Sequence, residues 1–264
     1  MTARLGELSG AWNFRDVSEA TGVRSGKFFR SSELSRLDDG GRELLRRLGI
    51  TDVADLRSPR ELERRGPGLV PAGVEVHLLP FPDVSAVDGE APHEATFQKM
   101  MREKPDDEDV AVAAGRFMTE EYQRFPTLGG AKRAVRQVIS LLAEGRPVIT
   151  HCFAGKDRTG FTVATVLEVV GADRDAIMAD FLRSNAAIAP LRERILESVR
   201  ERSETDETIT FAEARLTDEV LGVREEYLES ARRSIEENYG GLRGYLAAAG
   251  VTDDDVARLR AALS

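Results

Sequence analysis

The stretch PVITHCFAGKDRTGFTV at residues 147–163 constrains the fold more than any other part of the chain. Residues 148–150 are apolar or β-branched, which predicts a buried strand. From Gly160 onward, apolar residues recur at the spacing of a buried helix. A short loop with one glycine joins the two segments. We therefore expect a strand–loop–helix unit of the kind found in layered α/β proteins.

The loop of this unit, Cys152 to Arg158, has the composition of an oxyanion site. Successive backbone N–H groups of such a loop can turn inward to form an anion-binding nest. The helix that follows adds the positive end of its dipole. Gly155 permits a backbone conformation that a β-carbon would resist. Arg158 supplies a planar fork that matches two oxygens of a phosphate. The loop is therefore predicted to bind a tetrahedral oxyanion.

Cys152, the only cysteine of the chain, begins this loop. Helix N-termini and nearby cations lower the pKa of a thiol, so a thiolate could attack a bound phosphorus and give a phosphocysteine. His151 is expected to orient the loop by hydrogen bonding, and Thr159 to donate its hydroxyl to the sulfur. A lone cysteine is more often a small buried hydrophobe. The fixed offsets of Gly155 and Arg158 favour a nucleophile instead.

The remaining elements follow an alternating pattern. Residues 13–30 suggest a hairpin or an irregular β segment, and residues 83–110 a long acidic surface loop. Helical spacing dominates after residue 186, with an interruption at 203–208, and Thr252 is a good N-cap. The order predicts an α/β layer fold with a helical C-terminal extension. The other expected elements are helices at 40–48, 59–64, 111–125 and 129–144 and strands at 50–56 and 73–81.

Composition excludes several classes of protein. One cysteine rules out an internal disulfide, and three scattered histidines among 264 residues disfavour a structural metal site. A formal net charge of −9 disfavours non-specific nucleic-acid binding. The first ten residues lack the apolar core of a signal peptide, and no apolar run reaches the length of a membrane span. We expect no cofactor, no metal, no nucleic-acid partner and, by sequence, a cytoplasmic location.

The motif HCFAGKDRTG resembles the Cys-x5-Arg signature of the protein tyrosine phosphatase superfamily. The similarity to mycobacterial members of that superfamily covers nearly the whole chain and is weakest in the acidic loop at 83–110. It implies a single phosphatase domain over residues 1–264, built on a central, mostly parallel sheet flanked by helices. The other similar stretches are AWNFRDV (11–17), FFRSSELSRLDD (28–39), GITDVADLRSPRE (49–61), VHLLPFPD (76–83), MADFLRSN (178–185) and LGVREEYL (221–228).

The resemblance also implies roles for residues. Cys152 would be the nucleophile, and Arg158 would bind phosphate and stabilise the transition state. A lysine at position 156 resembles phosphoinositide phosphatases, where extra positive charge suits multiply phosphorylated headgroups. The implied substrates are phosphotyrosine, phosphoserine and phosphothreonine proteins and phosphoinositides. The resemblance also implies secretion without a cleaved signal, and we expect the protein to be a monomer. The remaining substrate-binding residues would be Phe153, Ala154, Gly155 and Thr159.

The general acid stays open between two aspartates. Expulsion of a phenolate benefits from a proton donor near the leaving oxygen, and most tyrosine phosphatases use an Asp on a Trp-Pro-Asp loop. Trp12 is the only tryptophan here, and no Pro-Asp follows it. Asp157, inside the phosphate loop, is the acid that the resemblance favours. Asp83, in Phe81-Pro82-Asp83 after a strand, imitates the usual tripeptide. We favour Asp157.

Two further expectations concern the surroundings of the loop. Arg15 is expected either to approach the phosphate or to form a buried ion pair with Asp16 or Asp55, and we favour the ion pair. The resemblance implies that residues 186–235 form a helical lid over the active site, which would also protect Cys152 from oxidation. The alternative is a C-terminal helical bundle packed permanently on the core.

Three other functions compete with a phosphatase. A rhodanese-type sulfurtransferase also holds a cysteine in an anion-binding loop, but the spacing of Arg158 and Thr159 fits phosphate better. An inactive phosphate-binding module would have no need of Cys152 and a nearby acid. An arsenate reductase normally needs further cysteines, and this chain has none.

Overall fold

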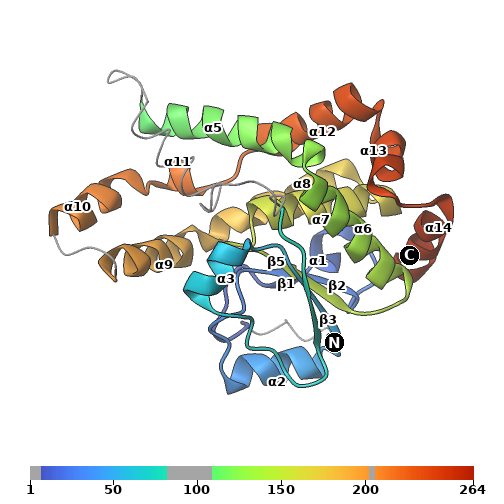
Figure 1. The fold of residues 1–264 in the computed structure, drawn as a ribbon, viewed down its shortest axis with the longest axis horizontal. Helices are drawn as coiled ribbons and strands as arrows, with labels where there is room; N and C mark the ends of the chain where they lie inside the picture. The colour runs from blue at the N-terminus through green and yellow to red at the C-terminus, as the bar shows by residue number, and fades with distance from the viewer. Residues whose placement is uncertain (1–6, 82–108, 202–205) are drawn as a thin grey trace.

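The computed structural model describes residues 7–81, 109–201 and 206–264. A five-stranded sheet lies among helices that make up most of the described chain (Figure 1). The strands are β1 (Arg15–Asp16), β2 (Phe28–Ser31), β3 (Asp52–Asp55), β4 (Glu75–Leu78) and β5 (Val148–His151). The helices are α1 (Ser18–Thr21), α2 (Asp39–Arg47), α3 (Pro59–Arg65), α5 (Val110–Arg124), η1 (Phe125–Thr127), α6 (Gly129–Ala143), α7 (Asp157–Val170), α8 (Arg174–Leu182), η2 (Arg183–Ala187), α9 (Ile188–Arg200), α10 (Asp206–Arg215), α11 (Asp218–Leu221), α12 (Glu225–Tyr239), α13 (Leu242–Ala249) and α14 (Asp253–Leu263).

Strand β5 occupies the centre of the sheet, whose order is β1-β2-β5-β3-β4. It pairs in parallel with β2 on one side and β3 on the other, while β1 is antiparallel to β2. The register places Ser31, His151 and Asp55 side by side at the carboxyl ends of three neighbouring strands. Since ligands of open α/β sheets bind at this edge, residues that directly follow these strands are in the position of a site.

The two faces of the sheet are buried against different layers. On one face, Phe28 and Val148 join the large core formed with α6, α7 and the C-terminal helices. On the other face, Phe29, Val53 and Ile149 join a smaller core closed by α2. The alternation follows from the two-residue period of a strand. In Figure 1, α2 lies below the sheet and the longer helices lie above it.

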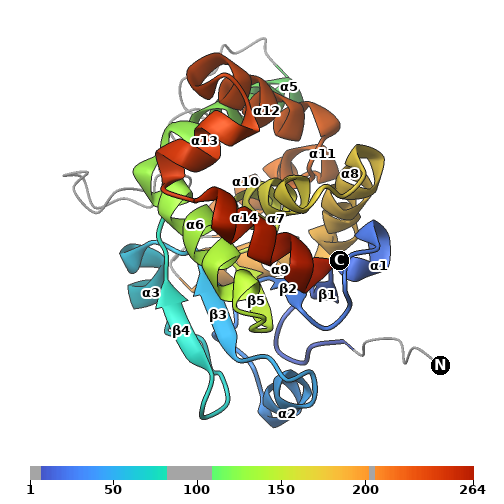
Figure 2. The same ribbon diagram turned by 90° about the vertical axis from the view of Figure 1, so that its right-hand side faces the viewer.

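The C-terminal helices divide into two groups. Helices α12 and α14 pack on α5 and α6 and belong to the main core, as the second view shows (Figure 2). The segment from α9 to α11 forms a separate apolar cluster through Leu191, Leu196, Leu216 and Leu221. This α9–α11 cluster also contains Ala154 of the loop between β5 and α7. The described parts of this stretch, residues 188–201 and 206–221, therefore lie against the loop, whereas α12 packs in the main core.

The expected α/β architecture with a mostly parallel central sheet is confirmed. The strand–loop–helix unit at 148–170 is present, and Thr252 caps α14 with Asp255 as its capping-box partner. The expected interruption at 203–208 is shorter than predicted, because α10 begins at Asp206. The expected acidic loop at 83–110 falls mostly outside the described residues; within them, Asp109 caps α5.

Within the described ranges, none of the helices combines the length and the apolar character that crossing a bilayer requires.

Candidate active site

The loop between β5 and α7 turns tightly against the end of β2. Gly155 has a positive φ of 67°, a conformation that L-residues with a side chain rarely adopt. A β-carbon at this position would stand 2.2 Å from the carbonyl oxygen of Ser31. Both constraints select glycine, so the sequence-based argument for this position is supported by the geometry.

The carbonyl groups of the loop point outward and are held by three residues from the N-terminal part of the chain. The side-chain amide of Asn13 donates to the carbonyl oxygens of Ala154 at 3.2 Å and Gly155 at 2.9 Å. Arg30 donates from Nη2 to the Gly155 oxygen at 2.8 Å. The backbone N–H of Glu33 donates to the Phe153 oxygen at 2.9 Å. These bonds fix the orientation of successive peptide planes.

The N–H groups of the loop are consequently left for another acceptor. Among the described residues, none accepts a hydrogen bond from the N–H groups of residues 153–158. The first N–H groups of α7 are part of this set, so the positive end of the helix dipole faces the same place. Successive unpaired amides of this kind form a concave anion-binding nest. The arrangement fits a tetrahedral oxyanion.

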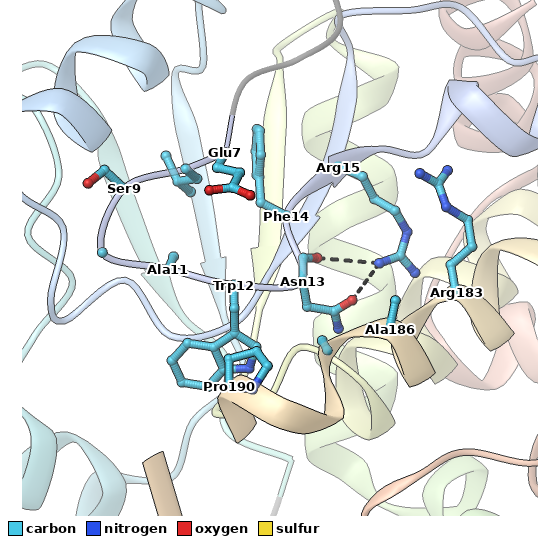
Figure 3. Close-up of a pocket in the computed structure, with 13 residues that line it drawn as sticks. Glu7, Ser9, Ala11, Trp12, Asn13, Phe14, Arg15, Arg183, Ala186 and Pro190 are labelled. Atoms are coloured by element: carbon cyan, nitrogen blue, oxygen red, sulfur yellow. Dashed lines mark hydrogen bonds between the residues drawn. The ribbon is translucent and has the colours of Figure 1, made fainter. Parts of the chain in front are cut away.

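A buried charge cluster supports the loop from below. The carboxylate of Asp180 on α8 forms ion pairs with Arg15 through Nε at 2.6 Å and with Arg30 through Nη1 at 2.6 Å. Burial alone would raise the pKa of Asp180, but the two guanidinium groups hold it below its usual value. Arg15 also donates to the side-chain oxygen of Asn13 at 2.6 Å, so the cluster orients the residue that holds the loop (Figure 3).

Arg15 forms a buried ion pair, as predicted, but the predicted partner was wrong. Arg15 pairs with Asp180 and not with Asp16 or Asp55. Asp16 instead accepts from the backbone N–H groups of Ser18 and Gly26. Asp55 is engaged by Arg57, whose Nη2 lies 2.7 Å from Oδ2. Asp180 stands 165 positions away from Arg15, and no local pattern could have indicated it.

Cys152 lies at the base of the loop with 2% of its surface exposed. It is a free cysteine that directly follows the central strand. The preceding His151 is fully buried, and its Nδ1 lies 3.1 Å from the Cys152 carbonyl oxygen. Because a carbonyl only accepts, Nδ1 carries the hydrogen. Burial lowers the pKa of His151 although the nearby Asp55 opposes this, so the ring is neutral near pH 7.

Arg158 is held in place by a carboxylate from α3. Its Nη1 and Nη2 atoms each donate to one oxygen of Glu61 at 2.7 Å, and Nη1 also donates to the Leu56 oxygen at 3.2 Å. Burial would lower the pKa of Arg158, but Glu61 more than offsets this, so the guanidinium stays charged. Among the described residues these bonds use three of the five N–H donors, which leaves donors for a bound anion.

Glu61 was not among the predicted site residues. Its signal in the sequence was a capping box: Ser58 and Glu61 exchange hydrogen bonds at the start of α3. One Glu61 oxygen both accepts from the Ser58 N–H at 2.7 Å and binds Arg158. The helix cap therefore fixes the carboxylate that orients the arginine. Only the tertiary structure reveals this second contact.

Asp157, the favoured acid, begins α7 beside the loop. Its Oδ1 accepts a hydrogen bond of 3.1 Å from the hydroxyl of Tyr122, and its Oδ2 lies 3.7 Å from Lys156 Nζ. Its side chain is 22% exposed. Asp83, the alternative acid, lies outside the described residues. The structure thus gives a position to one of the two candidates.

Lys156 reaches away from the loop to the segment that precedes α12. Its Nζ donates to the carbonyl oxygens of Leu221 at 2.5 Å and Gly222 at 3.2 Å. Asn185 completes this junction, since its side chain exchanges hydrogen bonds with the backbone of Val223. The lysine predicted to bind substrate therefore links the loop to the C-terminal helices in this structure.

Thr159 does not form the predicted bond to the nucleophile. Its hydroxyl is fully buried and has no hydrogen-bond partner in the part of the chain that the structure describes. The expected donation to the Cys152 sulfur is therefore wrong for this conformation. Thr159 lies within the first turn of α7.

Glu33 joins the loop to the C-terminal helices by charge. Its side chain is only 1% exposed. The carboxylate forms ion pairs with three arginines: with Arg57 Nη1 at 3.5 Å, Arg65 Nη1 at 3.4 Å and Arg194 Nε at 3.0 Å. Arg65 also lies over the Phe153 ring, 3.8 Å from its centroid. Arg194 belongs to α9, so one buried carboxylate holds the loop, α3 and α9 together.

A cavity of about 770 Å³ lies next to the site and is separate from the thiol. Figure 3 shows lining residues Trp12 and Asn13 from the N-terminal segment and Ala186 and Pro190 from η2 and α9. Its lining includes none of residues 152–158. Trp12 and Phe153 make an edge-to-face contact with ring centroids 6.1 Å apart, which forms the wall between the cavity and the loop.

A possible metal-binding group lies away from the loop. Asp52, Glu75 and His77 bring one ligand atom each within 4.8 Å of one another at the start of β3 and β4. Arg146 pairs with Asp52 at 2.7 Å and with Glu75 at 2.9 Å. The guanidinium thus already balances both carboxylates, and the group is an ion-pair network.

A central parallel strand, the free cysteine that follows it and a loop of unpaired amides with an arginine six residues later form the arrangement expected of a phosphatase. The chain belongs to the tyrosine phosphatase family, whose model matches residues 6–264. It is a protein phosphatase, and the predicted family resemblance is confirmed.

Named relatives are similar over most of the chain. The triple specificity protein phosphatase PtpB of Mycobacterium tuberculosis is 57% identical over 270 residues, which cover 97% of this chain and 98% of that protein. A protein of Cupriavidus necator named "Putative tyrosine-protein phosphatase" is 29% identical over 256 residues, 97% of this chain and 82% of its own. A tyrosine-protein phosphatase of Nostoc commune is 27% identical over 247 residues, 92% and 76% of the two chains.

Proposed function

We propose that this phosphatase hydrolyses phosphomonoesters without a metal, through a phosphocysteine intermediate on Cys152, within a single domain of residues 1–264. The observation that carries the proposal is the orientation of the loop. Asn13, Arg30 and Glu33 hold its carbonyl groups outward, and its N–H groups stay unpaired among the described residues. A phosphate that accepts from these amides would lie directly against the residue at the base of the loop.

The reaction takes place in two balanced steps. The Cys152 thiolate attacks phosphorus, an S–P bond forms, and the P–O bond to the leaving group breaks. Asp157 gives its proton to the departing oxygen. Water then attacks the phosphocysteine, Asp157 takes a proton from that water, and the S–P bond breaks to release inorganic phosphate and the thiolate. Arg158 and the amides of residues 153–158 stabilise the charge on the equatorial oxygens in both steps.

Replacement of Asp157 by asparagine tests the acid. General acid catalysis is worth about 10²–10⁴ in rate, and the benefit is greatest for leaving groups of high pKa. We expect kcat for alkyl phosphates to fall about a hundredfold or more, and kcat for p-nitrophenyl phosphate to fall much less. Steady-state kinetics on a series of leaving groups measures this. An equal loss on all substrates would move the assignment to Asp83.

The substrate range is proposed to include phosphotyrosine, phosphoserine and phosphothreonine proteins and phosphoinositides. Support comes from the similarity to a relative named as a triple specificity protein phosphatase. Lys156 would supply a second cation for a multiply phosphorylated headgroup once it leaves the carbonyls of Leu221 and Gly222. The test is a turnover panel of phosphopeptides and phosphoinositides at equal concentration, with a Cys152→Ser variant as the blank.

The expected lid of residues 186–235 is proposed here in a narrower form, as the segment 188–221. Cys152 is 2% exposed and Arg158 is 6% exposed, so part of the protein that covers these two residues must move before a phosphoprotein can reach them. The segment 188–221 covers Phe153 and Ala154 with its own apolar cluster. Helix α12 belongs instead to the main core through Tyr227 and Ala231, and it would stay in place.

Loss of the buried contact at Glu33 is expected to open this lid. In an Arg194→Met variant, α9 loses its bond to Glu33, and a hydrogen bond to a charged group is worth about 1.5–3 kcal/mol. Since a shift of about 1.4 kcal/mol changes an equilibrium tenfold, alkylation of Cys152 by iodoacetamide should speed up about tenfold or more. The measurement is the rate of thiol modification followed by mass spectrometry.

The matched control is Arg200→Met in the same helix. Arg200 pairs with Glu213 of α10 at 3.1 Å, and both side chains are about half exposed, so this pair is worth little and does not reach the core. We expect the wild-type alkylation rate. If Arg194→Met reacts no faster than Arg200→Met, the segment is a permanent part of the core and the lid proposal is wrong.

A further inference from the structure

A buried tyrosine outside the signature motif contacts the phosphate loop. Tyr122 lies in the last turns of α5 and is fully buried. Its hydroxyl donates to Asp157 Oδ1 at 3.1 Å. The contact joins residues 35 positions apart and reaches the first residue of α7.

The ring of Tyr122 is fixed on several sides by aromatic neighbours. Its centroid lies 4.9 Å from Phe125, 5.6 Å from Tyr227 and 5.9 Å from Phe181. These residues come from η1, α12 and α8, all of which pack in the main core. Close packing of this kind leaves the side chain one position, so the hydroxyl is a fixed point in the rigid part of the protein.

We propose that Tyr122 is a positioning residue that anchors Asp157 through Oδ1 and leaves Oδ2 as the oxygen that carries the transferable proton. The proposal rests on the general-acid role of Asp157 proposed above. Lys156, the other group near this carboxyl, is 3.7 Å from Oδ2, beyond hydrogen-bond distance. Oδ2 therefore lies near the positive charge of Lys156 without a hydrogen bond to it, whereas Oδ1 accepts the hydrogen bond from Tyr122.

The hydroxyl acts as a donor throughout the working pH range. Burial, and after it the charge of Asp157, raises the pKa of Tyr122 well above its ordinary value. The other charged or titratable groups that act on Tyr122 or Asp157 are Arg30, Cys152, Lys156, Arg158 and Tyr227. Tyr122 therefore stays protonated and acts as the donor in its bond to Asp157.

Removal of the hydroxyl has a consequence that a merely structural role would not produce. Without the anchor, the carboxyl samples non-productive orientations, so kcat for alkyl phosphates should fall about tenfold while p-nitrophenyl phosphate is much less affected. KM should stay unchanged for both substrates.

The experiment compares Tyr122→Phe with Tyr245→Phe in the full chain. Tyr245 is also buried among aromatic rings, and its hydroxyl has no hydrogen-bond partner within the described ranges. Its replacement removes a buried hydroxyl without breaking a bond to the site. We expect wild-type kcat and wild-type leaving-group dependence from Tyr245→Phe, and thermal unfolding of both variants shows that each is folded.

A double variant separates this proposal from the general-acid assignment. If Tyr122 acts through Asp157, then Tyr122→Phe in an Asp157→Asn background should cost nothing further. A full additional tenfold loss, or wild-type leaving-group dependence in the single Tyr122→Phe variant, would overturn the positioning role and leave Asp157 as the acid. Loss without leaving-group dependence in Asp157→Asn itself would overturn both.

Discussion

Replacement of Cys152 by serine should lower turnover by at least about four orders of magnitude on every phosphomonoester. A serine hydroxyl stays protonated near pH 7 and is intrinsically less nucleophilic than a cysteine sulfur. The oxygen is thus a far weaker nucleophile at the same position. Residual hydrolysis would come only from the positioning of water by the nest.

Binding should survive this substitution. Asn13, Arg30 and Glu33 orient the loop amides without any contribution from the sulfur. Titration of the Cys152→Ser variant with inorganic phosphate should therefore give a Kd within about tenfold of the wild-type value. Steady-state hydrolysis of p-nitrophenyl phosphate at rates close to wild type would contradict the assignment of Cys152 as nucleophile.

Replacement of Arg158 by lysine should have the second largest effect, a loss of about 10³-fold in kcat/KM. The substitution keeps a positive charge beside the buried Glu61, so it avoids leaving that carboxylate unpaired. It removes the planar fork that binds two phosphate oxygens at once. Kinetics and phosphate titration should both be impaired, since the guanidinium acts on the ground state and the transition state.

A Glu61→Gln variant keeps Arg158 but disturbs its orientation, so its kinetics separate the effect of orientation from the effect of losing the guanidinium. Glutamine keeps the shape of Glu61, but its single acceptor oxygen can take only one of the two bonds of 2.7 Å that hold the guanidinium. We expect a smaller loss, about tenfold in kcat/KM, with little change in fold. If Arg158→Lys retains near-normal kinetics, the arginine does not bind the transferring phosphoryl group.

The sequence was sufficient for the features whose causes are local. Strand β5, the turn at Gly155 and the start of α7 are encoded within some twenty consecutive residues, and each was predicted. The cap of α14 by Thr252 is equally local. Hydrophobic periodicity and turn chemistry act over one or two turns, which is the range at which a sequence pattern is informative.

The features that sequence missed depend on partners far along the chain. Arg15 was expected to pair with Asp16 or Asp55, but it meets Asp180 of α8, which also binds Arg30 of β2. Neither Glu61 nor Tyr122 was predicted as a site residue. Packing of separate elements decides which charges meet, and periodicity carries no information about that choice.

The hydroxyl of Thr159 was misplaced for a related reason. Its sequence position beside Arg158 suggested a bond to the sulfur, but its direction depends on how α7 is rotated against the sheet. In the structure that rotation turns the hydroxyl into a buried position without a partner among the described residues. Offsets along a motif fix which residues are near the loop, and helix packing fixes where their side chains point.

The most direct test is to trap the phosphocysteine itself. Wild-type enzyme is mixed with p-nitrophenyl phosphate, quenched in acid before the steady state, digested, and examined by mass spectrometry. The account predicts one phosphate on the peptide that contains Cys152, absent from the Cys152→Ser variant. Full turnover with no phosphorylated peptide at any quench time, or with the phosphate on another residue, would contradict it.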